Sequence, residues 1–170
     1  ALNDCKVEVL ITSNNAWKKL RHTKAISFPY LKYVILRDPD LGQNEISLTD
    51  AYLFESNFKA NFGSANDPAL LMYTSGSTGK PKGILHGHRV LASYRPSINL
   101  FFNLSMKDKN AVYWSPSDWA WVGGLLDMLF PAWMAGKPIA TSEDRFNADW
   151  AYKFIERHKV THTFLAPTAI

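Results

Sequence analysis

One short segment, residues 73–83, concentrates side chains that suit phosphate chemistry. It reads Tyr-Thr-Ser-Gly-Ser-Thr-Gly-Lys-Pro-Lys-Gly, so four aliphatic hydroxyls, three glycines and two lysines lie between two apolar runs. Glycines let backbone N–H groups approach an anion closely, while hydroxyls add donors and lysines add positive charge. The composition therefore predicts a loop that binds a polyphosphate.

The order of residues excludes two common phosphate motifs. A P-loop needs G-x-x-x-x-G-K-[ST] at the start of a helix, whereas Gly79-Lys80 is followed here by Pro81 and an apolar, strand-like run. The dinucleotide fingerprint G-x-G-x-x-G is absent as well. On composition alone, a ligand-free hairpin loop rich in turn-forming residues remains an alternative.

The ordered string YTSGSTGKPKG resembles the signature of the adenylate-forming superfamily, which comprises acyl-CoA synthetases, luciferases and the adenylation domains of peptide synthetases. The resemblance implies that the loop closes over the β- and γ-phosphates of ATP. It also implies that a carboxylate is joined to the α-phosphate, after which a thiol, usually that of coenzyme A, displaces AMP. The expected contacts are hydroxyls of Thr74, Ser75, Ser77 and Thr78, the backbone at Gly76 and Gly79, and the charges of Lys80 and Lys82.

A second resemblance covers residues 117–124, Ser-Asp-Trp-Ala-Trp-Val-Gly-Gly. It is similar to the segment beside the carboxylate pocket of acetyl- and medium-chain acyl-CoA synthetases, which implies that Trp121, Val122 and Gly123 touch the acyl group. Acetate enzymes typically carry threonine where Gly123 stands and histidine where Leu125 stands. The loss of bulk predicts room for an acid longer than acetate. The alternative is that these tryptophans are ordinary core residues.

The resemblance also implies groups that this sequence does not contain. They are a glutamate for magnesium, an aspartate for the ribose and a lysine on a carboxy-terminal domain, all expected beyond Ile170, so no catalytic residue is predicted here. The abrupt ends at Ala1 and Ile170 predict an excerpt of a longer protein. We expect a lead-in region, residues 1–66, then a phosphate-loop and acyl-pocket region, residues 67–170. We expect the excerpt alone to be inactive, with doubtful isolated stability.

Two histidines close in sequence are a candidate metal site. The spacing of His86 and His88 predicts that they share a strand face, where they could form a metal pair. Zinc needs at least a third ligand, and no nearby Cys, Asp or Glu has suitable spacing, so no metal site is predicted.

Composition is that of an ordinary soluble globular protein. The 170 residues are 46% hydrophobic and 20% charged, which disfavours disordered and fibrous classes. The formal net charge of +4 is scattered, so no nucleic-acid partner is expected. Residues 119–135 are too short and too interrupted for a transmembrane helix. With Cys5 the only cysteine, we expect the cytoplasm, or the mitochondrial matrix in a eukaryote.

Hydrophobic patterning predicts an α/β fold, a partial and mainly parallel sheet with helices on both faces, as part of the amino-terminal domain of an adenylate-forming enzyme. The predicted strands cover residues 7–11, 33–36, 69–74, 83–88, 111–114, 138–141 and 163–166. The predicted helices cover 16–20, a stretch capped by Thr49 or Asp50 that runs through Phe58, a stretch from Arg89 that Pro96 kinks or restarts, one from Asp118 to near Gly136, and one capped by Asn147.

The sequence thus favours an ATP-dependent, AMP-forming acyl-CoA synthetase. Its expected partners are ATP with Mg²⁺, coenzyme A and a short- to medium-chain or aromatic carboxylic acid. Two alternatives stay open: another adenylating enzyme, such as an amino-acid-activating domain or a luciferase-like enzyme, and a non-catalytic nucleotide-binding module. The sequence indicates no oligomeric state.

Overall fold

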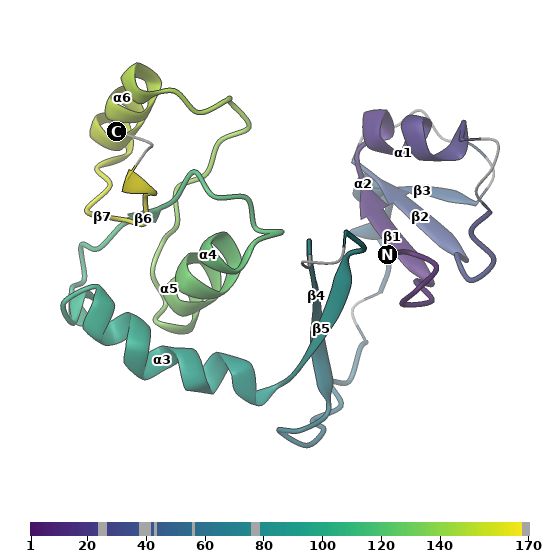
Figure 1. Cartoon of the computed structure of the whole chain (residues 1–170), viewed down its shortest axis with the longest axis horizontal. Coiled ribbons are helices and arrows are strands. Elements are labelled where there is room, and N and C mark those ends of the chain that lie inside the picture. Colours follow the sequence, from purple (N-terminus) through teal and green to yellow (C-terminus); the bar gives the residue numbers. More distant parts are fainter. Residues whose placement is uncertain (24–26, 38–41, 43, 56, 76–78, 168–170) are drawn as a thin grey trace. The chain divides into compact units, whose positions relative to one another are not determined.

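The computed structural model describes residues 1–23, 27–37, 42, 44–55, 57–75 and 79–167. The chain forms two compact units, Ala1–Phe62 and Gly63–Ile170 (Figure 1), which are described separately below.

The first unit is a parallel three-stranded sheet with two helices. Its strands lie in the order β1-β2-β3, and Val34 of β2 pairs with Leu10 of β1 and with Glu45 of β3. Alternation in β2 turns Val34 and Leu36 inward, where they are buried. The elements are β1 (Val9–Thr12), α1 (Asn14–Arg21), β2 (Tyr33–Leu36), β3 (Glu45–Ser47) and α2 (Leu48–Ala51).

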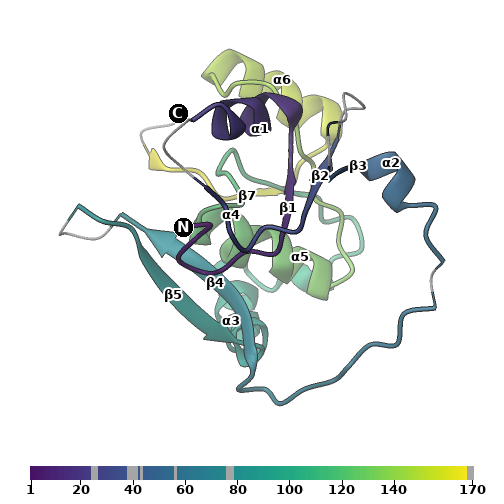
Figure 2. The ribbon, with the colours of Figure 1, turned by 90° about the vertical axis from the view of Figure 1, so that its right-hand side faces the viewer.

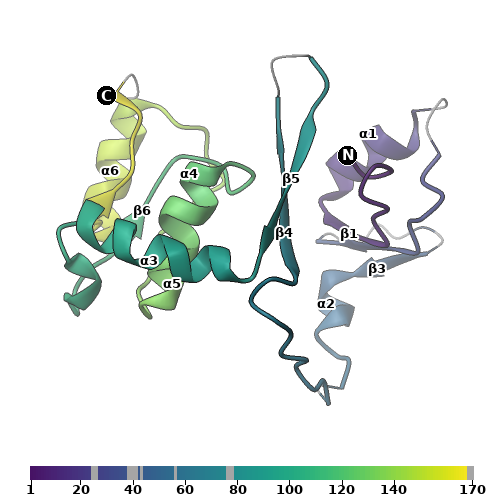
Figure 3. The same ribbon diagram turned by 60° about the horizontal axis from the view of Figure 1, so that its bottom comes forward.

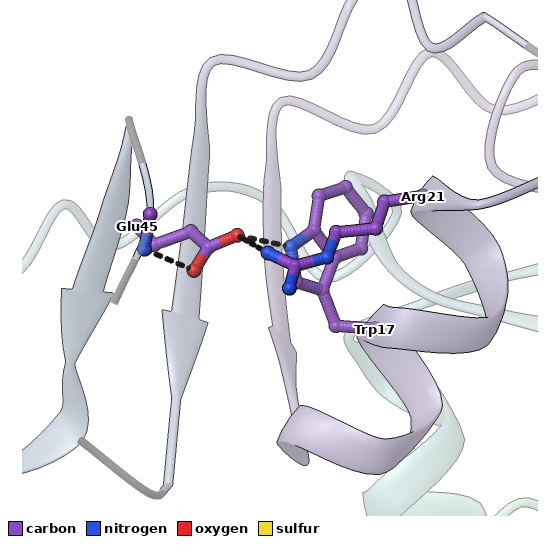
Figure 4. A network of polar contacts seen from close by, with 4 residues as sticks. Trp17, Arg21 and Glu45 are labelled. Carbon is purple, nitrogen blue, oxygen red and sulfur yellow. Dashed lines mark hydrogen bonds and ion pairs between the residues drawn. The ribbon is translucent and has the colours of Figure 1, made fainter. Parts of the chain in front are cut away.

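A carboxylate at the start of β3 links the sheet to helix α1 (Figure 4). The Glu45 side chain accepts hydrogen bonds from the indole N–H of Trp17, from Arg21 at 3.0 Å and from the Gly42 backbone N–H at 2.6 Å. The Glu45 side chain is only 4% exposed. Because α1 buries no residue, this polar connection is a main anchor of the helix.

Helix α2 is shorter than the sequence predicted. Ser47, not Thr49 or Asp50, is the N-cap, and its hydroxyl accepts from the Thr49 backbone N–H at 3.1 Å. The helix ends at Ala51 instead of reaching Phe58, whose side chain is 85% exposed. A short helix with no buried face has no packing energy to extend it.

The second unit begins with an antiparallel hairpin. Strands β4 (Pro68–Thr74) and β5 (Lys82–Gly87) lie side by side (Figure 2), and Tyr73 pairs with Gly83. Helix α3 (Arg89–Phe101) follows and is one continuous helix through Pro96, so no new helix starts there.

The apolar run that follows forms consecutive helical segments, α4 (Val122–Gly124), the π-helix η2 (Leu125–Leu129) and α5 (Phe130–Met134) (Figure 3). Gly136 follows in the left-handed region with φ of 65°, as expected for a glycine just past a helix end. The buried side of these helices packs with α3 and β6. This core comprises Ile98, Phe102, Ala111, Tyr113, Met128 and Ala132.

A parallel pair completes the unit. Strand β6 (Tyr113–Trp114) pairs with β7 (His162–Thr163), and Trp114 packs on Phe154 of α6 (Ala148–His158). Asn147 caps α6 as predicted, its side chain accepting from the Trp150 backbone N–H at 2.9 Å. A 3-10 helix, η1 (Ser105–Lys107), precedes β6.

The predicted α/β class with mainly parallel pairing is confirmed. The β1–β2, β2–β3 and β6–β7 pairs are parallel, and β4–β5 is antiparallel. The predicted strand at 138–141 was wrong in extent, because only Ile139 bridges to Tyr113. The strands predicted at 111–114 and 163–166 are likewise shorter in the structure.

Candidate functional site

The predicted phosphate-binding segment connects the two strands of the β4–β5 hairpin. Thr74 pairs with Lys82, so these two site residues lie opposite each other at the end of the ladder. A hairpin therefore holds both ends of the loop at fixed register. The loop residues Ser75, Gly79 and Lys80 are described, whereas the predicted contacts Gly76, Ser77 and Thr78 lie outside the described residues.

The described part of this loop is open to a ligand. Thr74, Ser75, Gly79, Lys80 and Lys82 are all exposed, so their polar groups face solvent. Gly79 has a φ of 81°, a conformation that glycine adopts without steric cost. A Cβ built on Gly79 meets no atom within 4 Å. Free space thus lies beside a left-handed glycine, with hydroxyl and ammonium donors nearby, which suits an anion.

In the second predicted segment, residues 117–121 form a turn and residues 122–124 form helix α4. Asp118 does not cap this helix, contrary to the sequence prediction. Its carboxylate instead accepts from the Ala120 backbone N–H at 2.8 Å, and its carbonyl accepts from the Trp121 N–H at 3.0 Å. The side chain therefore closes a local turn, and the helix starts later, at Val122.

Gly124 explains why the turn and the helix fit so closely. A Cβ at this position would lie 2.5 Å from the Asp118 carbonyl oxygen and 2.6 Å from that of Ser117. Because both atoms belong to the backbone, a side chain at position 124 would force the turn away from the helix. Gly124 thus holds the segment that carries Trp121 against the start of α4.

Gly123 contacts a ring rather than an open space. A Cβ on Gly123 would lie 2.8 Å from Cε1 of Phe164, which follows β7. The Phe164 ring occupies the volume that a side chain at position 123 would need. The missing side chain at Gly123 therefore does not by itself create the room for a longer acid that was predicted at this position.

Trp121 is not a core residue, which removes the alternative interpretation of this tryptophan. Its side chain is 63% exposed. It lines an open, mainly apolar cavity of about 430 Å³ together with Tyr73 of β4. The structure thus brings the strand that leads into the phosphate loop beside Trp121, while Val122 and Gly123 do not line this cavity. Its lining residues are Leu70, Leu71, Met72, Tyr73, Trp119, Ala120, Trp121 and Leu125.

A further cavity, of about 290 Å³, was not anticipated from the sequence. It lies beyond the carboxyl end of β6 and is lined by aromatic and polar side chains, among them Trp114, Asp118 and Asp144. Asp144 accepts from the Ser142 hydroxyl at 2.8 Å and from the Trp150 indole at 3.2 Å. The carboxyl end of a parallel strand is a common ligand position, so the strand prediction could have pointed here.

The described residues contain no three His, Cys, Asp or Glu side chains close enough to hold a metal ion. His86 lies on β5, but His88 lies past the end of that strand, so the two do not share a strand face. No described helix has the length and hydropathy needed to cross a membrane.

Comparison with known proteins agrees with the geometry. The sequence model of one family, AMP-binding enzyme, matches residues 1–170. Acetyl-coenzyme A synthetase of Drosophila melanogaster is 28% identical over an alignment of 208 positions that covers 98% of this chain. Acetyl-coenzyme A synthetase of Bacillus subtilis is 29% identical over 171 positions, covering 99% of this chain. The chain spans 30% and 29% of the length of these two relatives.

The fold agrees as well. The crystal structure of the anthranilate CoA ligase AuaEII in complex with anthranoyl-AMP superposes with a TM-score of 0.82 and 22% identity. The superposition covers 99% of this chain and 32% of the ligase chain. A family match over the whole chain, with the fold of an adenylate-forming enzyme, leads to one conclusion: this chain belongs to the AMP-binding enzyme family.

Proposed function

We propose that this chain is the phosphate-loop and acyl-site part of the amino-terminal domain of an ATP-dependent, AMP-forming acyl-CoA synthetase. In this reaction the carboxylate oxygen of the acid attacks the α-phosphorus of ATP and pyrophosphate leaves. The thiol sulfur of coenzyme A then attacks the acyl carbon, and AMP leaves. The observation that carries the proposal is the loop at the end of the β4–β5 hairpin, where exposed donors flank a left-handed glycine.

The described loop residues fit the β- and γ-phosphates of ATP. The hydroxyls of Thr74 and Ser75 donate hydrogen bonds, and the ammonium groups of Lys80 and Lys82 supply charge. The open space beside Gly79 lets a phosphate oxygen approach the backbone. Gly76, Ser77 and Thr78 complete the proposed contacts. Such a loop acts by positioning and charge stabilisation, which dominate catalysis at phosphates.

The acid is proposed to bind near Trp121, Val122 and Gly123. The cavity shared by Trp121 and Tyr73 is mainly apolar, which suits the carbon chain or ring of a short- to medium-chain or aromatic acid. The size and apolar lining of this cavity support this class of acid. The glycine at position 123 does not, because Phe164 fills the space beside it.

The rest of the machinery is proposed to lie outside this chain. That includes the magnesium ligand, the ribose contact and the catalytic lysine, so we expect these 170 residues alone to form no acyl-AMP. The free thiol of Cys5 suits a reducing compartment, either the cytoplasm or the mitochondrial matrix.

The proposal is tested with the full-length enzyme by measuring pyrophosphate release from ATP. The acids are acetate, butyrate, octanoate, decanoate and benzoate, each with and without coenzyme A. We expect release with at least one acid above acetate, and acyl-CoA product only when coenzyme A is present. Turnover only with amino acids would indicate an amino-acid-activating domain. Nucleotide binding with no turnover for any acid would indicate a binding module, and either result contradicts the proposal.

A further inference from the structure

One carboxylate, that of Asp127, lines an otherwise apolar cavity in the second unit. Asp127, on the π-helix η2, lines a cavity of about 230 Å³. The other lining residues are Ile98 and Phe101 of α3 and Phe164. Every other side chain of this cavity is apolar, so Asp127 is its single polar group among the described residues.

Asp127 has no hydrogen bond or ion pair with any residue that the structure describes. Burial raises the pKa of its carboxyl group. The nearby phenol of Tyr94 is affected in turn, since its own burial and then the charge of Asp127 raise the pKa of Tyr94. A half-buried carboxylate without a donor is unfavourable. A donor supplied by a ligand would remove that disadvantage.

The cavity is next to the position proposed to touch the acid. Asp127 follows Gly123 by four residues, about 6 Å along a helix, and so lies roughly one turn further on the same side. Phe164 connects the two places, because its ring contacts Gly123, a proposed acyl-site residue, and also lines the cavity of Asp127.

We infer that Asp127 binds the far end of the acid substrate and selects acids that carry a hydrogen-bond donor there, a hydroxyl or an amine. The substrate class is thus a terminal hydroxy or amino carboxylic acid, or a benzoic acid with such a group opposite its carboxyl. This inference rests on the proposed acyl-CoA synthetase function and names the substrate class of the same site.

The test compares matched acids on the full-length enzyme by pyrophosphate release. One set is butyrate with its terminal hydroxy and amino derivatives, and the other is benzoate with para-hydroxybenzoate and para-aminobenzoate. A site built to bond a substrate donor discriminates strongly against the analogue that lacks it. We expect kcat/KM at least about tenfold higher for a donor-bearing acid than for its unsubstituted partner.

Variants separate this role from a structural one. Asp127→Leu should lower the kcat/KM ratio of each donor-bearing acid to its unsubstituted partner to about one. Asp127→Asn should keep a preference for the hydroxy acid and lose that for the amine. Asp149→Asn, an exposed aspartate in the first turn of α6, is the control and should change neither.

Each result decides the inference. Equal use of substituted and unsubstituted acids by the wild-type enzyme would overturn it while leaving the proposed function intact. Equal proportional loss for all acids in Asp127→Leu would show a structural role and also overturn it. Absence of turnover with every acid would overturn the proposed function, and this inference with it.

Discussion

Replacement of Gly124 by alanine tests how the turn at 117–118 is held on helix α4. The added Cβ would lie 2.5 Å from one backbone carbonyl oxygen and 2.6 Å from another, well inside van der Waals contact. Overpacking of this kind costs about 1–3 kcal/mol. Alanine regains about 0.5–1 kcal/mol over glycine within a helix. Taking the middle of each range, about 2 and about 0.75 kcal/mol, we predict a net loss of about 1 kcal/mol for Gly124→Ala.

Gly123→Ala is the matched control, because its Cβ would meet the Phe164 ring instead of backbone. A ring can rotate or shift, so we predict a change within about 0.5 kcal/mol. The assay is urea denaturation of both purified variants and the wild type, followed by tryptophan fluorescence. A Gly124→Ala variant as stable as wild type, or a larger loss for Gly123→Ala, would refute the packing described for this segment.

Three other predictions concern the loop and the first unit. Lys80→Ala should weaken use of ATP by about 1.5–3 kcal/mol, roughly 10- to 150-fold in kcat/KM for ATP, and an unchanged value in steady-state kinetics would contradict its role. A Cβ on Gly79 would meet no atom, but alanine held at a φ of 81° is strained by about 1–3 kcal/mol. Gly79→Ala should therefore raise KM for ATP in steady-state kinetics and lower the urea denaturation midpoint, and no change in either would contradict the conformation described. Burial is the largest single effect on the pKa of Glu45, and it raises this pKa. Hydrogen bonds from the Gly42 N–H and from Trp17, together with the charge and hydrogen bond of Arg21, outweigh it, so the pKa lies below its usual 4.5. Because the pKa of Glu45 is lowered, its ionised carboxylate stabilises the fold at pH values above the usual pKa, and this contribution is lost as the pH falls. Glu45→Gln should therefore destabilise the fold by about 1–2 kcal/mol at neutral pH and by less in acid. A loss that does not depend on pH in urea titrations would contradict this prediction.

The sequence predicted the parts of the site that local chemistry determines. The apolar runs on either side of the loop were confirmed as β4 and β5, since their pattern and the turn residues between them agree. The cap of α6 was also predictable, because Asn147 precedes an amphipathic run and needs only its own backbone as a partner.

What the sequence missed depends on residues far apart in the chain. Asp118 could have capped a helix, but the carbonyls of its turn pack on Gly124, which delays the helix to Val122. The filling of the space at Gly123 depends on Phe164, about forty positions away, and no local pattern reveals such a contact. No sequence pattern marks Asp127 as a candidate binding residue. Its placement beside Phe164 in an apolar cavity is visible only in the structure.

The central claim is that this chain's loop serves the adenylation of a carboxylic acid. The most direct test is the exchange of radiolabelled pyrophosphate into ATP by the full-length enzyme, with and without acid and without coenzyme A. We predict exchange that requires the acid, proceeds without coenzyme A and falls in Lys80→Ala, since adenylation precedes thioester formation. No acid-dependent exchange, or formation of ADP in place of AMP, would contradict the account.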